Sequence, residues 1–333
     1  MTNPWHSRDA LSIALVAGLT IANLTAFGQS SAKLSSVEAT TPALSIPSLA
    51  STEVKAERAD VEERNYTSAE SRLLEEIRQH PDSPELLDLL GGIFFLHGKY
   101  FNSAIAYKKE EALKPLGTQS QFKLAMAYIL IGHRDWARPE VEKLARENPD
   151  DALYPYWLSR LDYDAQLFEK AIAEAEASIK RDPRMARAHD NLGLCYEAIG
   201  RFDEAIREYQ EAANLERAEQ QPSPWPDVNM ATLLVKLGRL DGVENALREA
   251  LQFDARFPRA HYQLGLLFEK QANNREAINE LQQAIQFDPS FDEPFYALGR
   301  IYQRTGERQR AASAYEEFRR LKEAKAERKE AIR

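Results

Sequence analysis

The sequence predicts an all-α fold in which helical hairpins repeat along the chain. Prolines recur every 34 residues over its middle part, and glycines keep the same period. The prolines are Pro81, Pro115, Pro149 and Pro183; the glycines include Gly98 and Gly132, with Gly200 two periods further on. A single helical hairpin cannot bury its own apolar face, so a fixed period of this length indicates neighbours that stack on one another.

One hairpin is clearest in residues 186–219. They are typical of two amphipathic helices joined at Gly200, and small residues within them let the helix axes approach closely. The first helix is marked by Leu192, Gly193 and Tyr196, and the second by Phe202, Ala205, Tyr209 and Ala212.

Equivalent stretches give eight repeats, the first of them incomplete, with a four-residue insertion at residues 220–223. The repeats begin near Ala50, Pro84, Thr118, Ala152, Ala186, Pro224, Pro258 and Asp292. Small residues occupy the eighth position from the second repeat onward, at Gly91, Ala125, Ser159, Gly193, Ala231, Gly265 and Gly299. The twentieth position is also small, at Ala69, Ser103, Ala137, Ala171, Ala205, Val243, Ala277 and Ala311.

The pattern of residues 192–212 resembles the tetratricopeptide repeat family. The residues that carry the resemblance are Leu192, Gly193, Tyr196, Ala205, Tyr209 and Ala212, and it extends over about residues 50–325. The resemblance implies a right-handed superhelical solenoid whose first helices line a concave groove. Large residues replace small ones at Glu57 in the eighth position and at Glu76, Glu110 and Phe318 in the twenty-seventh, and we expect those repeats to act as imperfect caps.

Before the repeats, residues 10–28 form an apolar run of 19 residues that is typical of a secretory signal peptide. Ala26, Phe27 and Gly28 provide a possible cleavage site. The same length suits an uncleaved membrane anchor, which stays the alternative. Residues 29–52 are rich in Ser, Thr, Ala and Pro and predict a flexible linker.

The repeats themselves, residues 53–325, predict one elongated domain with a continuous core. Residues 319–333 are strongly charged and predict a helix that covers the last apolar face. The formal net charge of −9 argues against general nucleic-acid binding, which needs a basic surface.

Searches for catalytic, metal-binding and phosphate-binding patterns give no convincing match, and we expect no enzyme, no cofactor and no metal site. Cys195 is the only cysteine and is interpreted as a buried filler rather than a catalytic thiol. The stretch from Gly92 to Lys99 resembles a phosphate loop only loosely, because Tyr100 replaces the required Ser or Thr. His189 and His261 share the fourth repeat position and are interpreted as packing residues.

What remains is a binding surface. In proteins that resemble this family, positions 2, 5, 9, 12 and 13 of each repeat tend to face the groove. In the second and third repeats these positions include apolar residues that are interpreted mainly as core, namely Phe95, Leu96, Phe122, Met126, Ile129 and Leu130. Further on they supply the candidate partner-binding residues Tyr156, Arg160, Tyr163, Lys236, Arg259, Tyr262, Lys270, Tyr296, Arg300 and Arg304, with Glu269 and Glu293 as acids among them.

Trp225, in the proline-rich stretch of residues 220–226, is a further candidate, with the alternative that it staples two helices. The sequence therefore predicts an exported, periplasmic scaffold that binds an extended or helical segment of another protein, whose acidic groups meet the basic end of the groove. The alternative is a membrane-anchored subunit of an envelope assembly or secretion machine.

Overall fold

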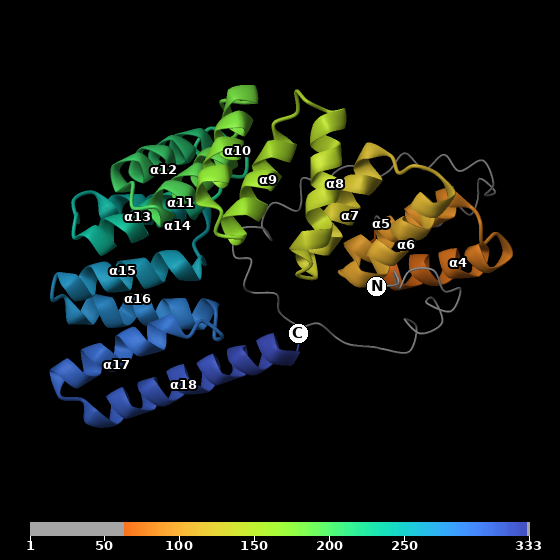
Figure 1. The fold of residues 1–333 in the computed structure, drawn as a ribbon. Coiled ribbons are helices and arrows are strands. Elements are labelled where there is room, and N and C mark those ends of the chain that lie inside the picture. Colours follow the sequence, from red (N-terminus) through yellow and green to blue (C-terminus); the bar gives the residue numbers. More distant parts are fainter. Residues whose placement is uncertain (1–62, 332–333) are drawn as a thin grey trace. The chain divides into compact units, whose positions relative to one another are not determined.

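The computed structural model describes residues 63–331, which form fifteen α-helices and no strand (Figure 1). The all-α fold class predicted from the period is confirmed. The signal or anchor segment, the linker and the first helix of the first repeat lie outside the described residues. Within residues 63–331 no helix combines the length and apolar composition that a membrane span needs.

The contacts divide the chain into two compact units, with the boundary between Asp150 and Asp151. The first unit holds α4 (Tyr66–Gln79), α5 (Pro84–Leu96), α6 (Tyr100–Leu113), α7 (Thr118–Leu130) and α8 (Arg134–Glu147). The second holds α9 (Leu153–Asp164), α10 (Phe168–Arg181), α11 (Ala186–Ala198), α12 (Phe202–Glu216), α13 (Trp225–Leu237), α14 (Val243–Phe253), α15 (Pro258–Lys270), α16 (Asn274–Phe287), α17 (Glu293–Thr305) and α18 (Arg308–Ala331). The first helix of each hairpin begins within one residue of the repeat start that the period gives.

In the described repeats the core consists of clusters of buried side chains that follow one another along the chain, and Leu234 packs against two such clusters of the second unit. In the second unit one cluster of buried side chains surrounds Leu192, Tyr209 and Leu233, and another surrounds Leu264 and Ile301. Each hairpin of a solenoid contacts chiefly its neighbours, so buried surface is shared between adjacent repeats and has no single centre.

Small residues at the eighth position make room for the side chain at the twenty-fourth position of the same repeat. A Cβ atom added to Gly193 would lie 2.6 Å from the ring of Tyr209, which is closer than real Cβ atoms approach. The same overlap pairs Gly91 with Tyr107, Gly265 with Leu281 and Gly299 with Tyr315. The eighth and twenty-fourth residues are therefore matched in size across each of these hairpins.

The small twentieth position lets the two helices of a hairpin meet closely, and it is fully buried in most repeats. Two serines in these columns bond to the facing helix: the Ser103 hydroxyl donates to the carbonyl of Gly91 at 2.8 Å, and the Ser159 hydroxyl to that of Ala171 at 2.6 Å. A serine fits here because the facing carbonyl satisfies its buried hydroxyl group.

The hairpin α13–α14 departs from the period in a way that the sequence does not reveal. The period places the start of α14 at Leu240, but the helix begins at Val243. Gly238 and Gly242 both take positive φ, 73° and 75°, so the turn contains two left-handed residues and is longer than its equivalents.

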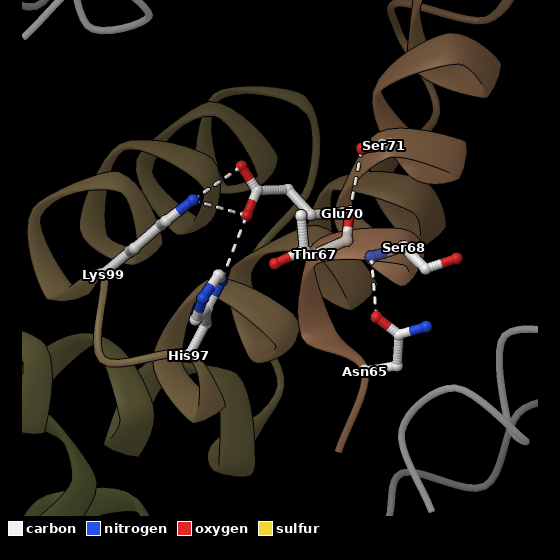
Figure 2. Close-up of polar contacts among 7 residues, drawn as sticks. All are labelled: Asn65, Thr67, Ser68, Glu70, Ser71, His97 and Lys99. Atoms are coloured by element: carbon white, nitrogen blue, oxygen red, sulfur yellow. Dashed lines mark hydrogen bonds and ion pairs between the residues drawn. The ribbon is translucent and has the colours of Figure 1, made fainter. Parts of the chain in front are cut away.

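At the N-terminal end of the first unit, Glu70 links α4 to the turn between α5 and α6. Figure 2 shows this carboxylate reaching the turn between α5 and α6, where it accepts from Lys99 Nζ at 3.0 and 2.7 Å and contacts His97 Nδ1 at 3.2 Å. Asn65 caps α4 through the backbone N–H of Ser68.

The last helix, α18, has 24 residues, compared with 14 in α16. Lys325 forms an ion pair with Asp292 at the start of α17, and its Nζ lies 3.9 Å from Glu293. The ring of Phe318 lies 5.2 Å from that of Tyr296. The charged C-terminal stretch therefore continues one long helix that packs along α17.

Candidate partner-binding face

The residues considered for catalysis and metal binding have structural roles in this fold. Burial raises the pKa of the Cys195 thiol to about 12, which disfavours the thiolate that reactive cysteines use. No group of His, Cys, Asp and Glu side chains within residues 63–331 is arranged to hold a metal ion. Lys99, the lysine of the loose phosphate-loop match, is engaged by Glu70 (Figure 2).

His189 and His261 make the same contacts in their two repeats. Nδ1 of His189 lies 2.8 Å from Glu208, and its Nε2 lies 3.2 Å from the carbonyl oxygen of Pro183. His261 repeats this with Glu280 at 2.7 Å and the carbonyl of Ala255 at 3.2 Å. Each ring therefore joins the two helices of its hairpin to the preceding loop.

The first helices α9, α11, α13, α15 and α17 carry all the candidate partner-binding residues, and they follow one another through the second unit (Figure 1). Because successive first helices contact each other, residues at one repeat position form a row across them. We call the exposed side of this row of helices the first-helix face.

At the α9 end of this face the three candidates are half-buried and separately engaged. The ring of Tyr156 packs on Trp157, that of Tyr163 packs on Phe168, and Arg160 donates to Asn191 Oδ1 at 3.3 Å. Burial also raises the pKa of Tyr163.

Trp225, Arg259 and Tyr262 are brought together around Phe291. The Arg259 guanidinium lies 5.6 Å from the ring centroid of Trp225 and 5.3 Å from that of Phe291. Tyr262 meets Phe291 edge to face at 5.1 Å, and Trp225 meets Phe257 in the same way at 4.9 Å. Trp225 is thus half-buried between helices and also contributes to the first-helix face.

Arg300 and Arg304, on α17, both reach Glu269 of α15. The shortest N–O distances are 2.6 Å from Arg300 and 3.8 Å from Arg304, which also donates to Asn274 at 2.8 Å. The basic end of the face is therefore partly neutralised by a carboxylate that is only 12% exposed.

The two lysines differ in their surroundings. Lys236 lies 3.3 Å from Glu197 of α11, and its ammonium group is 5.8 Å from the ring of Phe202. Lys270 is exposed at the C-terminal end of α15. Lys270 directly follows Glu269 in the sequence and adds positive charge at that end of α15.

Tyr296 is the most exposed aromatic residue of the described part of this face, with 44% of its surface accessible. It packs against Tyr315 at 5.8 Å and Phe318 at 5.2 Å, and Arg300 lies 5.4 Å above its ring. A ring that is held on one side and open on the other suits a contact with a partner.

Sequence reasoning misses two contributors. Phe291 lies in the loop before α17, outside the repeat positions that are assigned to the groove, and only its aromatic character marks it. Arg187 occupies the second repeat position, as Arg259 does, so the position rule is sufficient to find it. Its guanidinium lies 5.2 Å from the ring centroid of Tyr156.

The apolar positions of the second and third repeats are buried, in accordance with their interpretation as core. Phe95, Phe122, Met126, Ile129 and Leu130 each expose 8% of their surface or less. Leu96 is half-buried.

Stacked helical hairpins of this kind define a helical-repeat protein. Sequence comparison gives the family: models described as tetratricopeptide repeat match residues 156–222 and 295–331, and one described as TPR repeat matches residues 273–306. The chain belongs to the tetratricopeptide repeat family, whose general role is protein interaction.

The TPR repeat-containing protein YpiA of Bacillus subtilis is 25% identical over 202 residues. The match covers 60% of this chain and 46% of YpiA, so the chain spans about half the length of that relative.

Two solved structures share the fold over most of the chain. A tetratricopeptide repeat protein from Parabacteroides merdae superposes with a TM-score of 0.62 at 17% identity, over 75% of this chain and 97% of its own. A chain of the APC/C heterotetramer Cut9–Hcn1 gives 0.59 at 16% identity, over 71% of this chain and 46% of that chain. PilW, a type IV pilus biogenesis factor, superposes with a TM-score of 0.54 at 16% identity, over 59% of this chain and 90% of its own.

Proposed function

We propose that the protein is a non-enzymatic scaffold that binds a segment of another protein along the first-helix face of the second unit. The observation that carries this proposal is the gathering of Trp225, Arg259, Tyr262, Tyr296 and Arg300 on α13, α15 and α17. Aromatic and arginine side chains are the usual energetic anchors of protein interfaces.

The charge of this face supports an acidic partner segment. Arg300 and Arg304 share one acid, Glu269, and the face also carries Arg259 and Lys270, although the whole chain has a formal net charge of −9. A locally basic surface on an acidic protein steers acidic segments towards that surface.

The comparisons support the scaffold role at the level of the fold. Cut9–Hcn1 is a protein assembly, and PilW is described as a biogenesis factor. We extend this to an exported, periplasmic location, which the apolar run of residues 10–28 supports. The same run supports the second candidate, a membrane-anchored subunit of an envelope assembly or secretion machine.

An affinity capture tests the proposed face. Residues 29–333 serve as bait in an envelope extract, beside a variant with Arg300→Gln and Arg304→Gln, and the recovered proteins are compared by mass spectrometry. We expect the unchanged chain to recover one specific protein. The variant should recover at least about tenfold less of it, because it lacks two arginines that would anchor the partner.

The matched control removes the same charge from α18 with Arg319→Gln and Arg320→Gln, two exposed residues. Equal recovery by all three chains, with unchanged helicity, rejects the first-helix face as the binding surface.

A further inference from the structure

Arg259 contacts two aromatic rings at the start of α15. Its Cζ lies 5.6 Å from the ring centroid of Trp225 on α13 and 5.3 Å from that of Phe291 in the loop before α17. A ring contact uses the π surface of a guanidinium group and leaves the N–H donors, which lie in its plane, available at the edge.

Those donors are not used within the described part of the chain. Arg259 is exposed and forms no ion pair or side-chain hydrogen bond with residues 63–331. The other ring-contacting arginines of α17 and α18 differ, because Arg300 is paired with Glu269 and Arg310 with Glu307. Arg259 is therefore oriented by stacking alone.

The arrangement recurs two repeats earlier. Arg187 holds the second position of its repeat on α11, as Arg259 does on α15, and its guanidinium lies 5.2 Å from the ring of Tyr156 on α9. It too forms no ion pair within residues 63–331. In both cases an aromatic residue from the preceding first helix supports the arginine of the next.

We propose that Arg187 and Arg259 are two anchors for an extended acidic segment of the partner protein, each binding one carboxylate through paired N–H···O bonds. The inference rests on the proposed function, because it assigns the chemistry of the segment that the first-helix face binds. A stacked guanidinium with free N–H donors matches the planar carboxylate in a two-pronged geometry that a lysine does not reproduce.

The spacing of the two arginines sets the spacing of the acids. α11 and α15 are separated by α13, and packed helices lie about 8–10 Å apart, so the anchors are roughly 16–20 Å apart. An extended chain advances about 3.3 Å per residue. The two carboxylates are therefore expected about five or six residues apart.

Arg256 offers a matched control. Its guanidinium lies 5.6 Å from the ring of Phe287, which is the last residue of the second helix α16. It carries the same charge and also contacts a ring, but it stacks on a second helix instead of on the first-helix face.

The test measures fluorescence anisotropy of the full chain with labelled Gly/Ser peptides. One peptide carries two glutamates about six residues apart, a second carries them side by side, and a third carries glutamines instead. We expect the spaced acidic peptide to bind most tightly. Arg187→Gln and Arg259→Gln should each weaken it roughly tenfold, Arg259→Lys should weaken it too, and Arg256→Gln should change it less than about twofold.

Two results overturn the inference: no preference for the spaced acidic peptide, or an equal loss with Arg256→Gln, which indicates general charge attraction. Circular dichroism of every variant checks the fold. If the affinity capture succeeds while the peptides show no preference, the scaffold role is supported and the proposal that Arg187 and Arg259 bind two spaced carboxylates is rejected. If the spaced peptide is preferred while Arg300→Gln with Arg304→Gln leaves capture unchanged, the anchors stand and the α17 end of the face does not contribute.

Discussion

At the scale of single residues, size decides where a glycine is needed. Gly193 is required by the ring of Tyr209 packed against it, whereas Gly92 has its nearest described side-chain atoms at 3.7 and 3.8 Å. The small eighth column is visible in the sequence, but its partner at the twenty-fourth position is apparent only when both helices are placed together.

Gly193→Ala should therefore destabilise the chain by about 1–3 kcal/mol, because the new methyl group overlaps the Tyr209 ring. In a Tyr209→Val background the same change should cost less, since the third repeat already pairs Ala125 with Val141. Urea unfolding of the four chains measures this coupling. Gly92→Ala is the control, and additive losses would refute the proposed size match.

The sequence marks Glu110 only as a large residue at a repeat position that is usually small, and it does not reveal the protonation behaviour of the carboxyl group. Burial raises the pKa of its carboxyl group to about 8, helped by the nearby charges of Asp88 and Glu85 and opposed by Lys114 at 4.0 Å. One of its oxygens has no hydrogen-bond partner in the described structure.

Because the folded state raises this pKa, stability should fall as the pH rises from about 4.5 to about 8. Glu110→Gln should remove this loss and stabilise the chain at pH 8 by on the order of 1–3 kcal/mol, with little effect at pH 4. Thermal unfolding at both pH values measures it. The exposed Glu147→Gln is the control, and a gain that is equal at both pH values would argue against a buried charge.

At the scale of the elements, much of the hairpin pattern follows from the sequence. The first helices start where the period places them, because small and large residues recur at fixed positions. The late start of α14 does not follow from the period. Gly238 and Gly242 lengthen the turn before it, but Val243 still occupies the twentieth repeat position, so the repeat pattern gives no sign of the change. The pairing of Arg300 and Arg304 with one acid was also not predicted, because it joins side chains about 31 and 35 positions apart in sequence.

The candidate site follows from the sequence only in part. Residues such as Arg259 and Tyr296 are found because the groove positions recur with the period. Phe291 and the stacking of Arg187 on Tyr156 depend on contacts between repeats, which the period alone does not specify.

At the scale of the whole molecule, two compact units of tetratricopeptide repeats present successive first helices, and in the second unit these carry the aromatic and basic side chains. The residues that recur in every repeat are needed to pack the hairpins together. The residues available to a partner are therefore those that packing does not require. The central claim is that partner binding takes place on this face.

Site-specific photo-crosslinking in intact cells tests that claim most directly. A photoreactive amino acid replaces Tyr296 on the first-helix face or Leu167 in the turn between α9 and α10, and both residues are 44% exposed. We predict a discrete crosslinked partner from position 296 and none from position 167, because exposure is matched and only the face differs. The same partner captured equally from both positions, or from position 167 alone, would contradict the proposal.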